Sequence, residues 1–140
     1  MTLIAANKGT SGGGGGSEWT DSGTATASAN QEKTYTFNTG ISDIKSFRLV
    51  GTPTTSAWAS YRILVEWDKN RSNYYFSFML YSGRGEAYGA ESSVGVYSTT
   101  TYGQNLPKVE SVQNGEVIIK TPSISDARWA NFTYECYAVG

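Results

Sequence analysis

The chain reads YRILVEW from Tyr61 to Trp67 and YYFSFMLY from Tyr74 to Tyr81. Apolar residues recur at every second position in both stretches, which is typical of strands with one buried face. The alternating sets are Tyr61, Ile63, Val65 and Trp67 in the first stretch and Tyr74, Phe76, Phe78 and Leu80 in the second. Asp68 to Asn73, between them, is polar and rich in turn formers. We therefore expect two strands joined by a hairpin loop at the centre of the hydrophobic core.

Weaker alternation predicts further strands on both sides of this pair. Thr34–Phe37 alternates threonine with aromatic residues. Ile44–Val50 alternates until Gly51–Pro53, where we expect the strand to end because proline cannot donate to a β ladder. Near the other end of the sequence, Phe132–Val139 alternates again and predicts a last strand.

Glycine and tyrosine dominate two later segments without sustained alternation. These segments are Gly83–Gly89 and Tyr97–Gly103. They predict exposed loops around a short strand at Val94–Tyr97.

Val109–Val112 and Glu116–Lys120 flank the pair Asn114-Gly115. This pair is a strong hairpin signal because both residues accept positive φ. Short strands with turns at short intervals are typical of sandwiches. The sequence thus predicts an all-β fold, an antiparallel β-sandwich or jelly roll of about eight strands.

A flexible glycine-rich arm is expected before this body. Gly12–Gly16 is a run of glycines, and such chain has the most backbone entropy to lose on ordering. We predict that residues 1–17 form an N-terminal anchoring peptide and linker and that residues 18–140 form the β-sandwich domain. Leu3 and Ile4 are the predicted apolar anchors on a partner, and a disordered tail is the alternative.

Composition excludes most enzyme classes. The chain has no histidine and one cysteine. A His-ligated metal site, a Ser-His-Asp triad, a Cys-His dyad and an intrachain disulfide are therefore impossible. We predict no catalytic residues, no metal and no cofactor.

The charge balance argues against two classes of partner. The formal net charge is −1, which provides no overall field for nucleic acid. No apolar run approaches the length of a membrane span. Thr2–Ala6 lacks the basic region of a secretory signal, so we expect synthesis in the cytoplasm without a signal peptide.

Tyrosine and tryptophan are the candidate contact residues. Aromatics make up 14% of the chain, and many lie among Gly, Ser, Thr and Asn, as in adhesive loops. Trp58, Tyr88 and Tyr102 lie in predicted loops and are the expected glycan or host contacts. The alternative is that such aromatics pack in the core or on strand surfaces.

Three further sequence patterns are weaker indications of a functional site. Asp68–Ser72 faintly resembles a calcium loop, but no bidentate glutamate closes it, so a hairpin turn is favoured. Glu66, Glu86 and Glu91 could supply a carboxylate pair for glycoside hydrolysis, although most glutamates are solvated surface charges. Cys136 is expected to be a small buried side chain in a strand.

The segment Trp129–Gly140 resembles the final strand of small bacteriophage tail-fibre and virion-surface β domains. Tyr35–Phe37 and Ile44–Val50 are similar in cadence to those domains. The resemblance implies a virion structural protein, often trimeric, that is held on the particle by an N-terminal segment and faces host-surface polysaccharide. The short segment before the body favours a head-decoration or short tail-tip protein over a long fibre.

We therefore predict a non-enzymatic phage virion component, displayed on the virion surface and attached to other virion proteins through its N-terminal arm. A free carbohydrate-binding, lectin-like module is the alternative. The low content of charged residues leaves sheet edges little protected, so we expect a homo-oligomer, with a trimer preferred.

Overall fold

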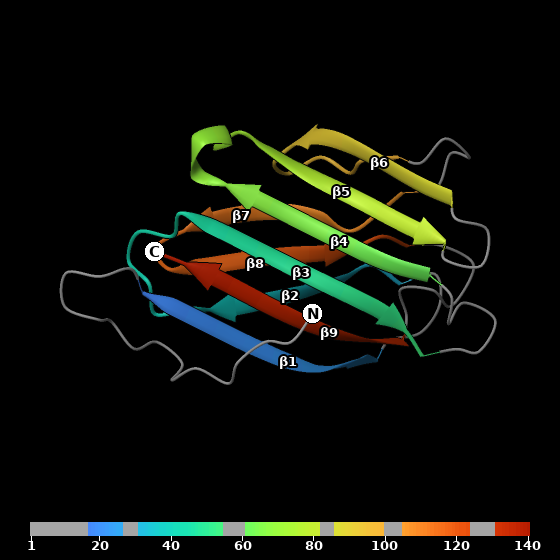
Figure 1. The fold of residues 1–140 in the computed structure, drawn as a ribbon, viewed down its shortest axis with the longest axis horizontal. Coiled ribbons are helices and arrows are strands. Elements are labelled where there is room, and N and C mark those ends of the chain that lie inside the picture. The colour runs from blue at the N-terminus through green and yellow to red at the C-terminus, as the bar shows by residue number, and fades with distance from the viewer. Residues whose placement is uncertain (1–16, 27–30, 55–60, 82–85, 100–104, 124–130) are drawn as a thin grey trace.

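The protein is a two-layered β-sandwich (Figure 1). The computed structural model describes residues 17–26, 31–54, 61–81, 86–99, 105–123 and 131–140. The strands in these ranges are β1 (Glu18–Thr26), β2 (Lys33–Asn38), β3 (Ser46–Pro53), β4 (Tyr61–Asp68), β5 (Tyr74–Tyr81), β6 (Glu86–Ser93), β7 (Lys108–Gln113), β8 (Glu116–Thr121) and β9 (Asn131–Val139). The predicted all-β sandwich is thereby confirmed.

The two layers differ in size. The larger sheet has the order β1-β9-β3-β4-β5-β6, and the smaller sheet, which lies behind it in Figure 1, has the order β2-β8-β7. All pairings are antiparallel, and β3 to β6 form a meander of consecutive neighbours. Strand β9 lies between β1 and β3, so strands far apart in the sequence are side by side.

The core lies between the facing sides of the two sheets. Its fully buried members from the larger sheet include Phe47, Ile63 and Val65, and those from the smaller sheet include Val117 and Ile119. Each large apolar side chain that is removed from water stabilises the fold by roughly 1.5–3 kcal/mol. Burial of these side chains therefore holds the two sheets together.

The buried face of β5 is not the one that the sequence alternation indicated. Ile63 and Val65 of β4 are buried, and they lie opposite Met79 and Ser77 of β5. Paired residues share a face, so Tyr75, Ser77 and Met79 face the core. Their apolar neighbours, the set Tyr74, Phe76, Phe78 and Leu80, lie on the outer face and are half-buried or exposed. The buried Ser77 hydroxyl is satisfied because it donates to the Pro107 carbonyl at 3.1 Å.

Other predicted elements need correction. Glu86–Ser93 is strand β6, so the predicted loop at residues 83–89 was partly wrong, and Tyr88 belongs to a strand. Val94–Tyr97 is a turn and bend, not a strand. Strand β3 continues through Pro53 because its pairing with β9 extends to Pro53, which lies opposite Phe132.

The predicted Asn114-Gly115 hairpin is confirmed. These residues join β7 to β8 with φ angles of 53° and 76°. The Gly115 carbonyl accepts hydrogen bonds from the backbone N–H of Thr39 at 2.9 Å and from its hydroxyl at 2.8 Å. The turn is therefore joined to the chain that leaves β2.

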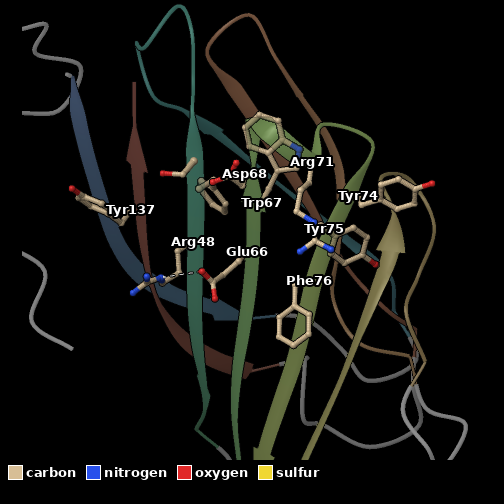
Figure 2. Close-up of a pocket in the computed structure, with 11 residues that line it drawn as sticks. Arg48, Glu66, Trp67, Asp68, Arg71, Tyr74, Tyr75, Phe76 and Tyr137 are labelled. Atoms are coloured by element: carbon tan, nitrogen blue, oxygen red, sulfur yellow. Dashed lines mark ion pairs between the residues drawn. The ribbon is translucent and has the colours of Figure 1, made fainter. Parts of the chain in front are cut away.

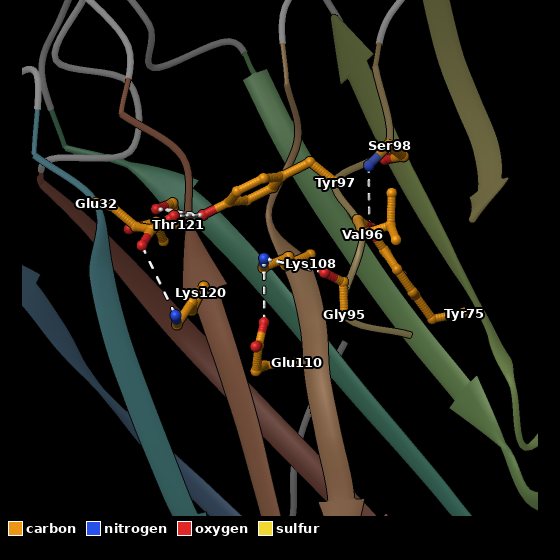
Figure 3. A network of polar contacts seen from close by, with 10 residues as sticks. All are labelled: Glu32, Tyr75, Gly95, Val96, Tyr97, Ser98, Lys108, Glu110, Lys120 and Thr121. Carbon is orange, nitrogen blue, oxygen red and sulfur yellow. Dashed lines mark hydrogen bonds and ion pairs between the residues drawn. The ribbon is translucent and has the colours of Figure 1, made fainter. Parts of the chain in front are cut away.

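A polar cluster attaches the segment after β6 to the smaller sheet (Figure 3). The Tyr97 hydroxyl donates to Glu32 Oε2 at 2.6 Å. Lys108 Nζ lies 4.2 Å from the centre of the Tyr97 ring and 3.1 Å from Glu110 Oε2. Lys120 Nζ lies 3.7 Å from Glu32 Oε1. Burial and the Glu32 carboxylate raise the pKa of Tyr97, which therefore remains a donor.

Acidification is expected to remove the stabilisation that Glu32 supplies. The Tyr97 hydrogen bond and then Lys120 hold the pKa of the Glu32 carboxyl below its ordinary value of 4.5. A carboxyl of this kind stabilises the fold fully above its unfolded pKa, and the contribution disappears as the pH falls through the folded pKa. Urea unfolding should find wild type more stable than Glu32→Gln at about pH 6, with a smaller difference at about pH 3. A difference that stays constant over this range would contradict the assignment.

Candidate functional site

The outer face of the six-stranded sheet carries a row of side chains that runs across the strands. Tyr137 of β9 lies opposite Arg48 of β3, and Arg48 lies opposite Glu66 of β4. Glu66 lies opposite Phe76 of β5, and Phe76 lies opposite Glu91 of β6. Because directly paired residues share a face, these five side chains form one line across five adjacent strands.

A groove of about 370 Å³ opens along this row. Figure 2 shows the side chains around it, which come from β9, β3, β4, β5 and the turn between β4 and β5. Its outward-facing lining consists of Ser46, Arg48, Glu66, Asp68, Arg71, Tyr74, Phe76 and Tyr137. The groove thus combines aromatic rings with charged hydrogen-bonding groups on an open surface.

The arginines of the groove are paired with carboxylates. Arg48 Nε lies 3.7 Å from Glu66 Oε2 across β3 and β4. Arg71 forms an ion pair with Glu91, so its side chain reaches over β5 to β6. These pairs are substantially exposed, so they hold side-chain positions more than they stabilise the fold.

The turn that carries Arg71 is held from several sides. A short 3-10 helix spans Lys69–Arg71, and the Asp68 carboxylate accepts from the Asn70 N–H at 2.8 Å at its start. The indole N–H of the buried Trp67 donates to the Ser72 carbonyl at 3.3 Å. Lys69 Nζ contacts Asp43 Oδ1 at 2.6 Å. These contacts therefore hold in place the turn that carries Arg71.

Phe76 is part of a stacked aromatic pair. Its ring centre lies 6.0 Å from that of Phe78, with an interplanar angle of 23°. Both rings lean over Gly89 of β6, where an added Cβ would come within 2.8 Å of Phe76 and 2.9 Å of Phe78. The glycine gives the rings the space to lie against the sheet.

Tyrosines stand at two borders of the groove. Tyr74 is 47% exposed and is one of the most exposed large apolar residues in the part of the chain that the structure describes. The Tyr137 hydroxyl donates to Glu18 Oε1 at 3.1 Å. Burial and then the Glu18 carboxylate raise the pKa of Tyr137, so its hydroxyl stays protonated at neutral pH. Both rings are available to a ligand.

Most of the predicted contact residues lie in parts of the chain that the structure does not describe. Leu3, Ile4, Trp58 and Tyr102 lie outside the described residues. Tyr88 lies in β6 with its backbone opposite Met79, and its side chain is outside the description. The groove is built from strand residues and from Arg71 of the β4–β5 turn, and the sequence had indicated only a few of these, Glu66 among them, as candidate functional side chains.

The structure also shows where the candidate carboxylates and the calcium-like turn lie. Glu66 and Glu91 flank Phe76 with backbones about 10 Å apart, two strand spacings. Each is tied to an arginine, and the side chain of Glu86 is outside the description. Asp68–Ser72 forms the favoured hairpin turn, with the Asp68 carboxylate bound to backbone.

Cys136 is fully buried in β9, as predicted. Burial raises the pKa of its thiol well above the ordinary value. Among the residues that the structure describes, no three metal-ligating side chains cluster. The described residues also contain no helix that is long and apolar enough to span a bilayer.

Comparisons with known proteins give no relative. No protein-family model matches the chain, and no curated protein or solved structure is significantly similar to it. The resemblance to phage virion-surface domains therefore stays a prediction from the sequence.

Proposed function

We propose that this chain is a non-enzymatic recognition domain that binds polysaccharide through the groove on its six-stranded sheet. The observation that carries the proposal is the row from Tyr137 to Phe76, in which aromatic rings flank the Arg48–Glu66 pair on an open surface. Polysaccharide binding is the activity that the virion adhesin and the lectin-like module have in common.

The chemistry of the groove suits sugar rings. Each sugar has an apolar face that can stack on an aromatic side chain and hydroxyl groups that need hydrogen-bond partners. Phe76 supplies a ring held by Phe78, and Arg48 and Glu66 supply donors and acceptors beside it. An open groove accepts a polymer without requiring a chain end.

Phe76→Ala is expected to weaken polysaccharide binding about tenfold or more, because it removes the apolar area of one aromatic contact. The wild-type chain is first tested against a polysaccharide array, and the affinity of the best ligand is then measured by calorimetry. Val96→Ala is the matched control, since Val96 is 56% exposed and lies outside the groove. Failure to bind any polysaccharide, or equal binding by Phe76→Ala, would contradict the proposal.

The setting of the domain is proposed from the sequence resemblance and the glycine-rich segment: a phage virion surface, with residues 1–17 as the attachment arm. Deletion of residues 1–17 separates this setting from the free lectin. An attached virion protein should lose particle association and keep its fold and glycan binding. A lectin should keep all of its binding.

A further inference from the structure

We propose that the ligand of this groove is a neutral polysaccharide that lies across the strands, from Phe76 on β5 to Tyr137 on β9. This inference rests on the proposed function and adds the charge class and the direction of the bound chain.

The groove is longer across the strands than along them. Its row from Tyr137 through Arg48 and Glu66 to Phe76 covers three strand spacings, about 14 Å. Along β5 its outward lining extends only from Tyr74 to Phe76, two residues or about 7 Å. An extended chain therefore makes the most contacts when it runs across the strands.

Along β5 the lining of the groove ends at Phe76. Phe78 lies next along the outer face of β5, and its cross-strand neighbour there is Leu64. Neither residue lines the groove, and the rings of Phe76 and Phe78 are folded together over Gly89. The Phe78 and Leu64 side chains follow the groove along β5 and β4 and supply no hydrogen-bonding groups for sugar hydroxyls.

The charges of the groove compensate one another. Arg48 and Arg71 are the lining cations, and Glu66 and Asp68 are the lining anions. Arg71 is moreover paired with Glu91. A polysaccharide with carboxylate, sulfate or phosphate groups would meet arginines that carboxylates already neutralise, and it would approach those carboxylates at an electrostatic cost. An uncharged chain avoids this repulsion and still finds donors and acceptors.

The two ends of the proposed path can be tested with variants at equal distances from Phe76. Tyr137 lies about 14 Å away across the strands, and Leu80 lies about 14 Å away along β5, on the same outer face. Tyr137→Ala should weaken binding of a hexasaccharide about tenfold and leave binding of a disaccharide unchanged. Leu80→Ala should change neither affinity. Tyr137→Phe keeps the ring and should bind like wild type.

The charge class is tested with neutral glucans, galactans and mannans against polymers that carry uronate or sulfate groups. We expect binding of a neutral polymer whose affinity stays within about twofold between about 50 mM and about 500 mM salt, since screening acts only on charged ligands. Binding restricted to charged polymers would overturn the neutral class. Weakening by Leu80→Ala but not by Tyr137→Ala would overturn the direction. After either of these outcomes, the proposed function still stands if Phe76→Ala loses binding. If the wild-type chain binds no polysaccharide at all, the proposed function itself is overturned.

Discussion

Replacing Phe47 with alanine is expected to lower the free energy of unfolding by about 3–5 kcal/mol. Phe47 is 1% exposed in β3, which has paired neighbours on both sides. Its ring centre lies 5.9 Å from that of Phe37 in the smaller sheet, so it joins the two layers. Truncation removes this contact and leaves a cavity that neighbouring side chains fill only in part. Urea denaturation followed by tryptophan fluorescence measures the loss.

The outward-facing Phe76 provides the comparison. The same change at Phe76 should cost under about 2 kcal/mol, since its ring is half-buried and no cavity forms in the core. Equal losses in the two variants would mean that the outer face of β5 is packed like a core. The comparison also establishes that Phe76→Ala is folded when its binding is measured.

Tyr75→Phe is expected to lower the free energy of unfolding by about 1–3 kcal/mol. Tyr75 is 2% exposed, and its hydroxyl donates to the Val96 carbonyl at 2.6 Å and accepts from the Ser98 N–H at 3.0 Å. The substitution keeps the ring and leaves the buried Ser98 N–H unpaired. Hydrogen exchange at the Ser98 amide should accelerate together with the loss seen in urea denaturation.

Tyr74→Phe is the control for this variant. Tyr74 precedes Tyr75 in β5 and is 47% exposed on the opposite face of the sheet. Removal of its hydroxyl should leave stability within about 0.5 kcal/mol of wild type. If Tyr75→Phe behaved in the same way, the hydrogen bonds of Tyr75 would not hold the segment after β6.

Alternation predicted most strands because a half-buried strand imposes a period of two on its sequence. It predicted β2, β4 and β5, and the Asn114-Gly115 signal located the β7–β8 hairpin. Strand β1 was not singled out, because EWTDSGTAT contains few apolar residues and takes its place by pairing with β9. Because β1 and β9 are far apart in the sequence, their pairing leaves little local sequence pattern from which β1 could be predicted.

The groove could not be predicted because it depends on register. YYFSFMLY has apolar residues on both faces, and only its pairing with β4 decides that Phe76 points outward. The ion pair of Arg71 with Glu91 likewise joins a turn to a strand that was predicted as loop in part.

The position of β9 between β1 and β3 has a consequence for how the chain folds. The Tyr137–Glu18 hydrogen bond joins residues 119 positions apart, whereas the meander from β3 to β6 forms between consecutive strands. Closing such a long loop is entropically costly and slows folding. During synthesis the meander can assemble early, but β1 and one edge of β3 must wait for β9. Until then both edges are open to wrong partners, which makes the arrival of β9 the step at which aggregation and folding compete.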